Sequence, residues 1–208
     1  MSPTPSEYQY LIYALLLGSY LLGSIPFGLI LTKLAGHGDI RTIGSGNIGA
    51  TNVLRTGNKP LAILTLLLDG GKGALAVCIG HLLTNDNALI GMLMGLCAVV
   101  GHIFPVFLKF KGGKGVATAI GFYLMLSWQL GLAVIAMWLL IAFVLRKSSA
   151  AAIAAIGGAP IFAWFLDMPE FSLYLMALSA LIIYRHRDNI DRLLKGTEPS
   201  IGNKGGKR

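Results

Sequence analysis

The chain has 208 residues, of which 55% are hydrophobic and only 12% are charged. Soluble domains carry about 25% charged residues, so the composition excludes an ordinary soluble protein and indicates a polytopic membrane protein. The formal net charge is +8, but in a membrane protein a basic excess first reports which side of the bilayer each loop occupies.

We expect a single integral membrane domain over residues 1–208, because no polar stretch is long enough to hold a second domain. The first nine residues carry no basic group, and the apolar run after them is too long for the core of a signal peptide. We therefore expect that run to stay in the membrane. Cys78 and Cys97 lie in apolar runs, which is typical of small buried side chains, and no Cys/His cluster suggests a metal site.

Apolar runs separated by polar residues predict an all-α fold with about seven transmembrane helices. In chain order, the predicted helices cover residues 10–33, 60–83, 88–108, 115–127, 130–145, 150–166 and 171–184. Several of them, notably the fourth and the seventh, are shorter than the ~20 residues that span a bilayer as a helix.

The basic residues fall on alternate sides of these helices. Sixteen of the 17 Lys and Arg residues lie in four segments on one side of a seven-helix chain, residues 33–59, 109–114, 146–147 and 185–208. The other connections hold none of them. The positive-inside rule then predicts that the N-terminus is outside and the C-terminus is cytoplasmic, which requires an odd number of crossings.

The remaining basic residue, Lys72, lies inside the second predicted helix, in a GGKG sequence at residues 70–73. Ionisable residues within a span usually form pairs or serve a function. Asp69 lies three residues before Lys72, so the two can pair on one helix face. Contact between Lys72 and a substrate phosphate is the alternative. We expect this GGKG copy to mark a closely packed, locally bent helix.

The first polar motif follows the first predicted helix and reads RTIGSGNIGATNVLR, residues 41–55. Glycine permits close approach of the backbone to a ligand, successive backbone N–H groups can hold an anion, and arginine offers a fork to phosphate. A flexible connector would not need clustered Asn, Thr and Arg residues. The predicted phosphate-binding loop consists of Ser45, Gly46, Asn47, Thr51, Asn52 and Arg55.

The second motif, KFKGGKGVAT, covers residues 109–118. It is not a Walker A loop, since that pattern places Ser or Thr directly after the lysine, where this chain has glycine. A glycine-rich turn that leads into a helix N-terminus nevertheless favours an anion. The predicted anion site consists of Gly112, Gly113, Lys114 and Gly115. Lys109 and Lys111 are expected to lie at the membrane surface.

The third motif, YRHRDNIDRLLKGTE, covers residues 184–198. His186 and Asn189 are three residues apart and would share one face of a helix, with Arg185 and Arg192 flanking them. The simpler interpretation is an amphipathic tail on the bilayer surface. His186 and Asp191 also have the H-x-x-x-x-D spacing of a separate acyltransferase class. On one continuous helix these side chains diverge by about 140°. A pair would need the helix to begin between the two residues, and we do not expect one.

Together, these motifs resemble those of the bacterial acyl-phosphate:glycerol-3-phosphate acyltransferase family, PlsY. GSGNIGATNVLR resembles its first motif, GHIFPVFLKFKGGKG its second and HRDNIDRLLKGTE its third, in the same order and at helix boundaries. The resemblance covers nearly the whole chain. It implies a multi-pass enzyme of the bacterial inner (plasma) membrane with its active site facing the cytoplasm.

By this resemblance, the protein would transfer a fatty acyl group from acyl phosphate to the 1-hydroxyl of glycerol 3-phosphate. The products would be lysophosphatidic acid and inorganic phosphate, in the first step of phospholipid synthesis. The resemblance implies no cofactor, no metal, no CoA and no carrier protein. Membrane lipids would be the other partners, with no nucleic acid, and the oligomeric state stays open, a monomer included.

The resemblance also implies roles for particular residues. The catalytic set would be Ser45, Arg55, Lys114, His186 and Asn189. Ser149 would help to bind phosphate, although Ser148 is an alternative and either serine could instead cap a helix. Glu198 would be structural.

An acyl phosphate is already activated, so its leaving group needs charge stabilisation, which Arg55, Lys114 and the glycine-rich loops can supply. The base could be His186, whose ordinary pKa is suitable, or a substrate phosphate oxygen, which the resemblance favours. An acyl-enzyme on Ser45 would need a neighbouring base that the sequence does not show. Two other functions remain open: a transporter of a phosphorylated solute, and an acyl-CoA-dependent acyltransferase that uses His186 and Asp191.

Overall fold

The computed structural model describes residues 4–201, which form helices and no strand. The all-α prediction is therefore confirmed for this part of the chain. The helices are α1 (Pro5–Ser24), α2 (Phe27–Leu34), α3 (Ala50–Val53), α4 (Lys59–Leu83), α5 (Ala88–Ile103), α6 (Val116–Leu126), α7 (Trp128–Leu145), α8 (Ser148–Phe165), α9 (Pro169–Tyr184) and α10 (Arg187–Leu194). Three basic residues that were counted for the topology lie outside the described residues: Lys204, Lys207 and Arg208.

Each predicted helix has a counterpart, but α1 begins at Pro5 rather than at residue 10, and two further predicted boundaries were wrong because of proline. The first predicted helix is broken, because α1 ends at Ser24 and α2 begins at Phe27, directly after Pro26. The third ends at Ile103 rather than residue 108, two residues before Pro105. Proline lacks the N–H that a continuing helix needs, and it disfavours helical geometry in the residue before it.

Five helical segments are long and apolar enough to cross a membrane. They are Ser6–Leu34, Lys59–Leu83, Ala88–Leu108, Trp128–Leu145 and Ser148–Phe165. Two further apolar helices are shorter, Val116–Leu126 and Pro169–Tyr184. These are the fourth and seventh predicted helices, the two that were expected to be short.

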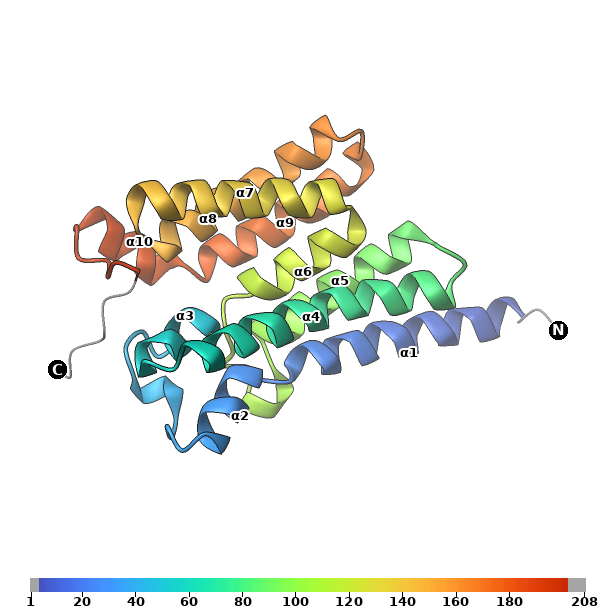
Figure 1. Ribbon diagram of the computed structural model, residues 1–208. Coiled ribbons are helices and arrows are strands. Elements are labelled where there is room, and N and C mark those ends of the chain that lie inside the picture. The colour runs from blue at the N-terminus through green and yellow to red at the C-terminus, as the bar shows by residue number, and fades with distance from the viewer. Residues whose placement is uncertain (1–3, 202–208) are drawn as a thin grey trace.

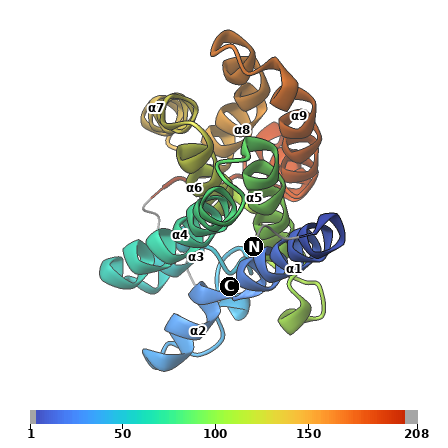
Figure 2. The same cartoon turned by 90° about the vertical axis from the view of Figure 1, so that its right-hand side faces the viewer.

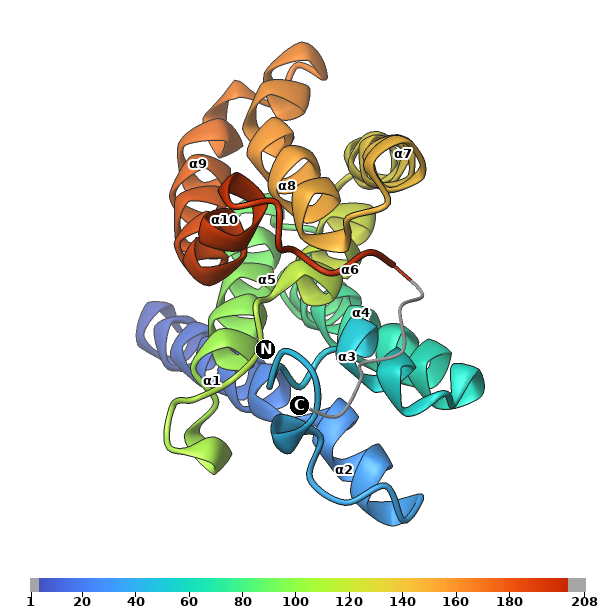
Figure 3. The ribbon, with the colours of Figure 1, turned by 90° about the vertical axis from the view of Figure 1, so that its left-hand side faces the viewer.

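The helices form one bundle (Figure 1). α1, α4 and α5 run side by side, α6 packs against α4 and α5, and α7, α8 and α9 complete the other side, as the end-on view shows (Figure 2). The short helices α2, α3 and α10 all lie at the end of the bundle opposite the start of α1, and Figure 3 looks directly at this end. The bundle therefore brings the first and third polar motifs together.

The first GGKG copy lies in a very close contact between two helices of the bundle. A Cβ added at Gly73 would lie 2.1 Å from the carbonyl oxygen of Thr118, and one added at Gly121 would lie 1.9 Å from that of Gly70. No side chain fits there, so α4 and α6 pack backbone against backbone, as small residues allow in membrane helices. The prediction that this copy marks a closely packed helix is confirmed.

Candidate active site

One buried amide organises the loop that precedes α3. The side chain of Asn52 is 1% exposed. Its Nδ2 atom donates hydrogen bonds to the carbonyl oxygens of Ile40 (2.9 Å), Ile43 (3.0 Å) and Asn47 (2.8 Å). A small core below the loop, which includes Ile40, Ile48 and Val53, holds it against α2 and α4. The loop is thus fixed without regular secondary structure.

The oxygen of the same amide positions two predicted site residues. Oδ1 of Asn52 accepts from the backbone N–H of Ser45 (3.1 Å), from the Ser45 hydroxyl (3.2 Å) and from Nη1 of Arg55 (3.3 Å). Gly44 has a φ of +56°, and a Cβ there would lie 2.5 Å from Arg55 Nη1, so the loop needs glycine at this point. Both ends of the amide are engaged within the loop, which favours a positioning role for Asn52 over the predicted phosphate contact.

The outer part of this loop is open to a ligand. Ser45, Gly46 and Thr51 are exposed, and Asn47 is half-buried. The Thr51 hydroxyl lies 3.2 Å from that of Ser148, the first residue of α8. The loop therefore meets the connection between α7 and α8, which the sequence had offered only as a separate candidate.

The glycine loop, residues 111–115, lies against the end of α5. The N–H groups of Gly112 and Gly113 donate to the carbonyl oxygens of Ile103 (3.2 Å) and His102 (3.0 Å). Gly115 has a φ of +87°, where an L side chain is strained, and α6 begins at the next residue. The expected glycine-rich turn into a helix N-terminus is confirmed.

Lys114, at the centre of this loop, points to the third motif. Its ammonium group donates a hydrogen bond to Oδ1 of Asn189 on α10. Burial lowers the pKa of Lys114 to about 8, with the nearby cations Arg192 and Arg55 adding to the effect and Glu198 opposing it. The three motifs are thus close enough for their charges to interact.

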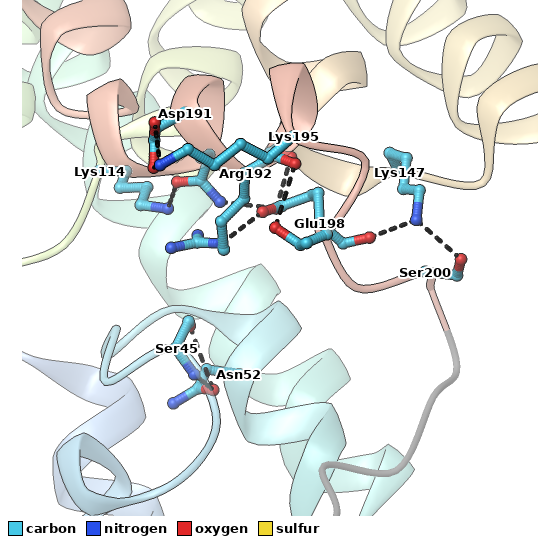
Figure 4. Close-up of polar contacts among 12 residues, drawn as sticks. Ser45, Asn52, Lys114, Lys147, Asp191, Arg192, Lys195, Glu198 and Ser200 are labelled. Atoms are coloured by element: carbon cyan, nitrogen blue, oxygen red, sulfur yellow. Dashed lines mark hydrogen bonds and ion pairs between the residues drawn. The ribbon is translucent and has the colours of Figure 1, made fainter.

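The carboxylate of Glu198 connects several of these side chains (Figure 4). It accepts hydrogen bonds from Nδ2 of Asn189 (2.7 Å), from the Ser149 hydroxyl (2.6 Å) and from Nε of Arg192 (2.7 Å). Burial alone would raise the pKa of Glu198, but these hydrogen bonds outweigh it and keep the pKa below its usual value. The contacts support the structural role that the resemblance implied for Glu198.

The two adjacent serines point to different partners. Ser149 is buried and donates to Glu198, whereas Ser148 contacts Thr51. Lys147, directly before them, donates to the backbone carbonyl of Glu198 and to the Ser200 hydroxyl. The segment after α10 is therefore held across the start of α8. Ser149 is linked to Asn189 and Arg192 because all three contact the Glu198 carboxylate.

His186 and Asn189 are both buried, at 2% and 5% exposure. Nδ1 of His186 lies 2.8 Å from the carbonyl oxygen of Ile182. A carbonyl can only accept, so Nδ1 carries the proton and Nε2 keeps a free lone pair in the neutral ring. Burial lowers the pKa of His186 to about 4, with Lys114 and Arg185 adding to the effect. The ring is neutral at pH 7.

A His186–Asp191 pair does not form. α10 begins at Arg187, so His186 and Asp191 do not belong to one continuous helix, although the prediction from the sequence assumed that they did. The side chains still part, since the Asp191 carboxylate pairs with the Lys195 ammonium at 2.9 Å and His186 contacts Ile182. The absence of the pair was predicted correctly, but for a different physical reason.

Arg192 belongs to the site, although the sequence offered it only as a flanking residue. Figure 4 shows Arg192 beside Glu198, facing Ser45 and Asn52 on the opposite loop. Burial lowers the pKa of the half-buried Arg55, Glu198 opposes this shift and Arg192 adds to it, so the three charges lie close enough to interact. Its position three residues after Asn189, on the same face of α10, was the available signal.

Lys72 lies inside the bundle, on α4. Its ammonium is 2.9 Å from Oδ1 of Asp69 and donates to the carbonyl oxygen of Ile25 at 2.9 Å. The predicted Asp69–Lys72 pair is confirmed. The ammonium is engaged inside the bundle, which favours a role in holding the bundle together over the alternative, a contact between Lys72 and a substrate phosphate.

Comparisons with known proteins agree with this arrangement. A protein described as glycerol-3-phosphate acyltransferase from Paramagnetospirillum magneticum is 54% identical over 193 residues, covering 93% of this chain and 95% of that protein. One with the same description from Caulobacter vibrioides is 57% identical over 190 residues, covering 91% and 87%.

Solved structures give the same result. A crystal structure of PlsY, an integral membrane glycerol 3-phosphate acyltransferase, in its glycerol 3-phosphate form has a TM-score of 0.86 and 42% identity, covering 92% of this chain and 96% of that one. Its lysophosphatidic acid form gives 0.84 and 41%, covering 92% and 95%. Residues 13–196 match the family described as glycerol-3-phosphate acyltransferase, and the chain belongs to this family.

Proposed function

We propose that this protein transfers a fatty acyl group from acyl phosphate to the 1-hydroxyl of glycerol 3-phosphate. As a member of its family, the chain acylates glycerol 3-phosphate to lysophosphatidic acid. The acyl phosphate donor and the roles of individual residues are the new parts of the proposal. They are supported by the cations that meet at one end of the bundle.

In this proposal, three cations near the Glu198 carboxylate bind the substrate phosphates. Arg55 and Lys114 come from the first and second motifs, and Arg192 comes from the third. Glu198 is occupied by Ser149, Asn189 and Arg192, so it does not neutralise Lys114 directly. A site of this charge suits two phosphate-bearing substrates and the inorganic phosphate that leaves.

In the proposed reaction, the 1-hydroxyl oxygen of glycerol 3-phosphate attacks the acyl carbon. The bond between that carbon and the phosphate oxygen breaks, and the hydroxyl proton moves to a phosphate oxygen. A phosphate group has a second pKa near 6, whereas the pKa of His186 is lowered to about 4. The phosphate oxygen is thus the stronger base, and neutral His186 can orient the hydroxyl through the lone pair on Nε2.

We also propose seven membrane crossings in a bacterial inner membrane, with the N-terminus outside and the active site facing the cytoplasm. The two shorter helices, α6 and α9, would complete the five longer spans. Sixteen of the 17 basic residues fall on one side of such a chain, which the positive-inside rule assigns to the cytoplasm. The start of α1 and the helix α10 lie at opposite ends of the bundle, as an odd number of crossings requires (Figure 1).

The observation that carries this proposal is the continuous set of contacts from Lys114 through Asn189 and Glu198 to Ser149. The test uses purified protein in lipid nanodiscs, with glycerol 3-phosphate and either a long-chain acyl phosphate or the matching acyl-CoA. We expect lysophosphatidic acid and inorganic phosphate in equal amounts from acyl phosphate only.

Turnover of acyl-CoA alone would overturn the choice of donor. Uptake of glycerol 3-phosphate into sealed proteoliposomes without any product would favour the transporter. Loss of product in Asp191→Ala would favour a catalytic His186–Asp191 pair, because in the structure the Asp191 carboxylate is exposed and pairs with Lys195.

A further inference from the structure

A buried ionic cluster lies in the bundle beneath the glycine loop. Asp69 and Lys72 belong to α4 and His102 belongs to α5, and they are 2%, 3% and 5% exposed. Oδ1 of Asp69 lies 2.9 Å from Nζ of Lys72 and 3.5 Å from Nδ1 of His102. The reaction proposed above uses none of these three groups.

On one side, this cluster reaches the break between α1 and α2. Pro26 has no N–H to continue the helical hydrogen bonds, and the carbonyl of Ile25, which accepts from the Phe27 N–H at 3.1 Å, lies at the C-terminal end of α1. Lys72 donates to this carbonyl at 2.9 Å, and its ammonium lies 5.6 Å from the centre of the Phe27 ring. A cation at a helix C-terminus is stabilised by the helix dipole. Lys72 therefore ties α4 to the break.

On the other side, the cluster reaches the glycine loop. A Cβ added at Gly113 would lie 2.1 Å from Nε2 of His102, and the three atoms nearest to it all belong to that imidazole. The N–H of Gly113 also donates to the carbonyl oxygen of His102 at 3.0 Å. The loop backbone thus rests on the ring, one residue before Lys114.

A buried ion pair is a poor way to gain stability. Its desolvation penalty can exceed the attraction, and well-packed apolar side chains often serve as well or better. Apolar side chains could pack α4 against α5, but they could not link α4 to the Ile25 carbonyl, which also accepts from the Phe27 N–H at 3.1 Å, or place a carboxylate 3.5 Å from His102. What the ionic cluster adds is a fixed geometry between two irregular segments.

We propose that Asp69, through Lys72 and His102, fixes the α1–α2 break relative to the glycine loop, and that His102 thereby positions Lys114 in the phosphate site. All three are positioning residues. The inference rests on the proposed role of Lys114 in phosphate binding.

The test is a double-mutant cycle, read out as the affinity of purified protein for glycerol 3-phosphate by calorimetry. We expect His102→Ala to weaken binding about tenfold in the otherwise native chain, and less than twofold when Lys114 is already alanine. Neighbouring residues that act together are non-additive in this way. His81→Ala, which removes a histidine at the far end of α4, is the matched control and should leave the affinity unchanged.

Gly113→Ala tests the same contact without removing the imidazole, should His102→Ala fail to fold. The added methyl group displaces the loop from the imidazole, so it should also weaken binding. Where His102→Ala does fold, combining it with Gly113→Ala should restore part of the affinity that Gly113→Ala loses, since it removes the three atoms that the methyl group meets.

Equal losses from His102→Ala in both Lys114 backgrounds would overturn the inference and leave the phosphate site intact. Unchanged affinity in Lys114→Ala would overturn both the inference and the proposed site. A loss from Lys72→Met that adds fully to that of Lys114→Ala would make Lys72 a substrate contact instead, which also contradicts the inference.

Discussion

The ammonium group of Lys114 donates a hydrogen bond to the side-chain oxygen of Asn189, 75 residues further along the chain. The amide nitrogen of Asn189 in turn donates to Glu198 at 2.7 Å. This contact joins the glycine loop, which leads into α6, to α10. Because this contact links the two segments, removing either the Lys114 or the Asn189 side chain should disturb the position of the other.

Lys114→Ala should abolish most of the activity while the protein stays folded. We expect kcat/KM for glycerol 3-phosphate to fall about 10²–10³-fold, the usual range for losing one group that stabilises transition-state charge. Lys109→Ala and Lys111→Ala are matched controls, since both side chains are exposed in the same loop. Losses as large in these controls would mean that the charge of the loop matters rather than the position of Lys114.

Lys72→Met, in contrast, should lower the stability of the protein rather than act on the reaction directly. It leaves Asp69 buried without its ammonium partner, and breaking a buried pair this way costs about 3–5 kcal/mol. We expect a lower Tm and a poor yield of folded protein in detergent. Asp69→Asn with Lys72→Met removes both charges and should recover part of the Tm. A Lys72→Met protein with normal Tm and no activity would contradict this assignment.

The activity should fall as the pH rises through about 8. Burial lowers the pKa of Lys114 to about 8, and the phosphate site needs its charged form. The ammonium is therefore present below that pH and lost above it. A pH profile of kcat/KM should show this limb, and Lys114→Arg should move it upward because arginine stays charged. An alkaline limb that is unchanged in Lys114→Arg would assign the limb to another group.

His186→Gln should raise KM more than it lowers kcat. Gln can place a polar atom where Nε2 lies, so orientation of the hydroxyl is partly kept. If His186 were the general base, we would expect a loss in kcat of about 10²–10⁴-fold, as general-base catalysis contributes this much. In that case the native enzyme would also show an acidic limb near pH 4, the value to which burial lowers the His186 pKa.

Acid should destabilise the protein through Glu198. Hydrogen bonds from Ser149, Asn189 and Arg192 hold the pKa of this carboxyl below its ordinary 4.5. A lowered pKa stabilises the folded state above pH 4.5, and this stabilisation is lost as the pH falls through the lowered value. The Tm of native protein should fall over this window. Glu198→Gln should have a lower Tm at pH 7 and a flatter dependence on pH, whereas an equally steep dependence would implicate another carboxyl.

The sequence predicted the helices well because apolar runs are a local property. α4, α6, α7, α8 and α9 each lie within two residues of their predicted bounds. The breaks at Pro26 and Pro105 were missed, although both prolines were visible, because their apolar neighbours carried the hydrophobic pattern across them. α3 is only four residues long, so it has no periodicity to read.

The site residues were found as chemical types, but their roles depended on their partners. Asn52 and Lys72 had the side chains expected of phosphate ligands, yet each is engaged by groups that lie elsewhere in the chain, at Ile40 and at Ile25. Arg192 was visible only as one of several basic residues. His102 was overlooked because a lone histidine in an apolar run gives no indication that it contacts the glycine loop.

By itself, the sequence determined that this is an all-α membrane protein with three polar motifs, and it indicated the family. These properties follow from composition and from local patterns. The sequence also assigned the second GGKG copy to the anion site and the first to a packed helix, but only the tertiary structure decided which contacts each copy makes. Gly70 and Gly73 are used where α4 and α6 touch, while Gly113 and Gly115 let the chain turn over His102 and present Lys114 to Asn189. The same four letters differ in role because one copy lies within a packed helix and the other lies between helices.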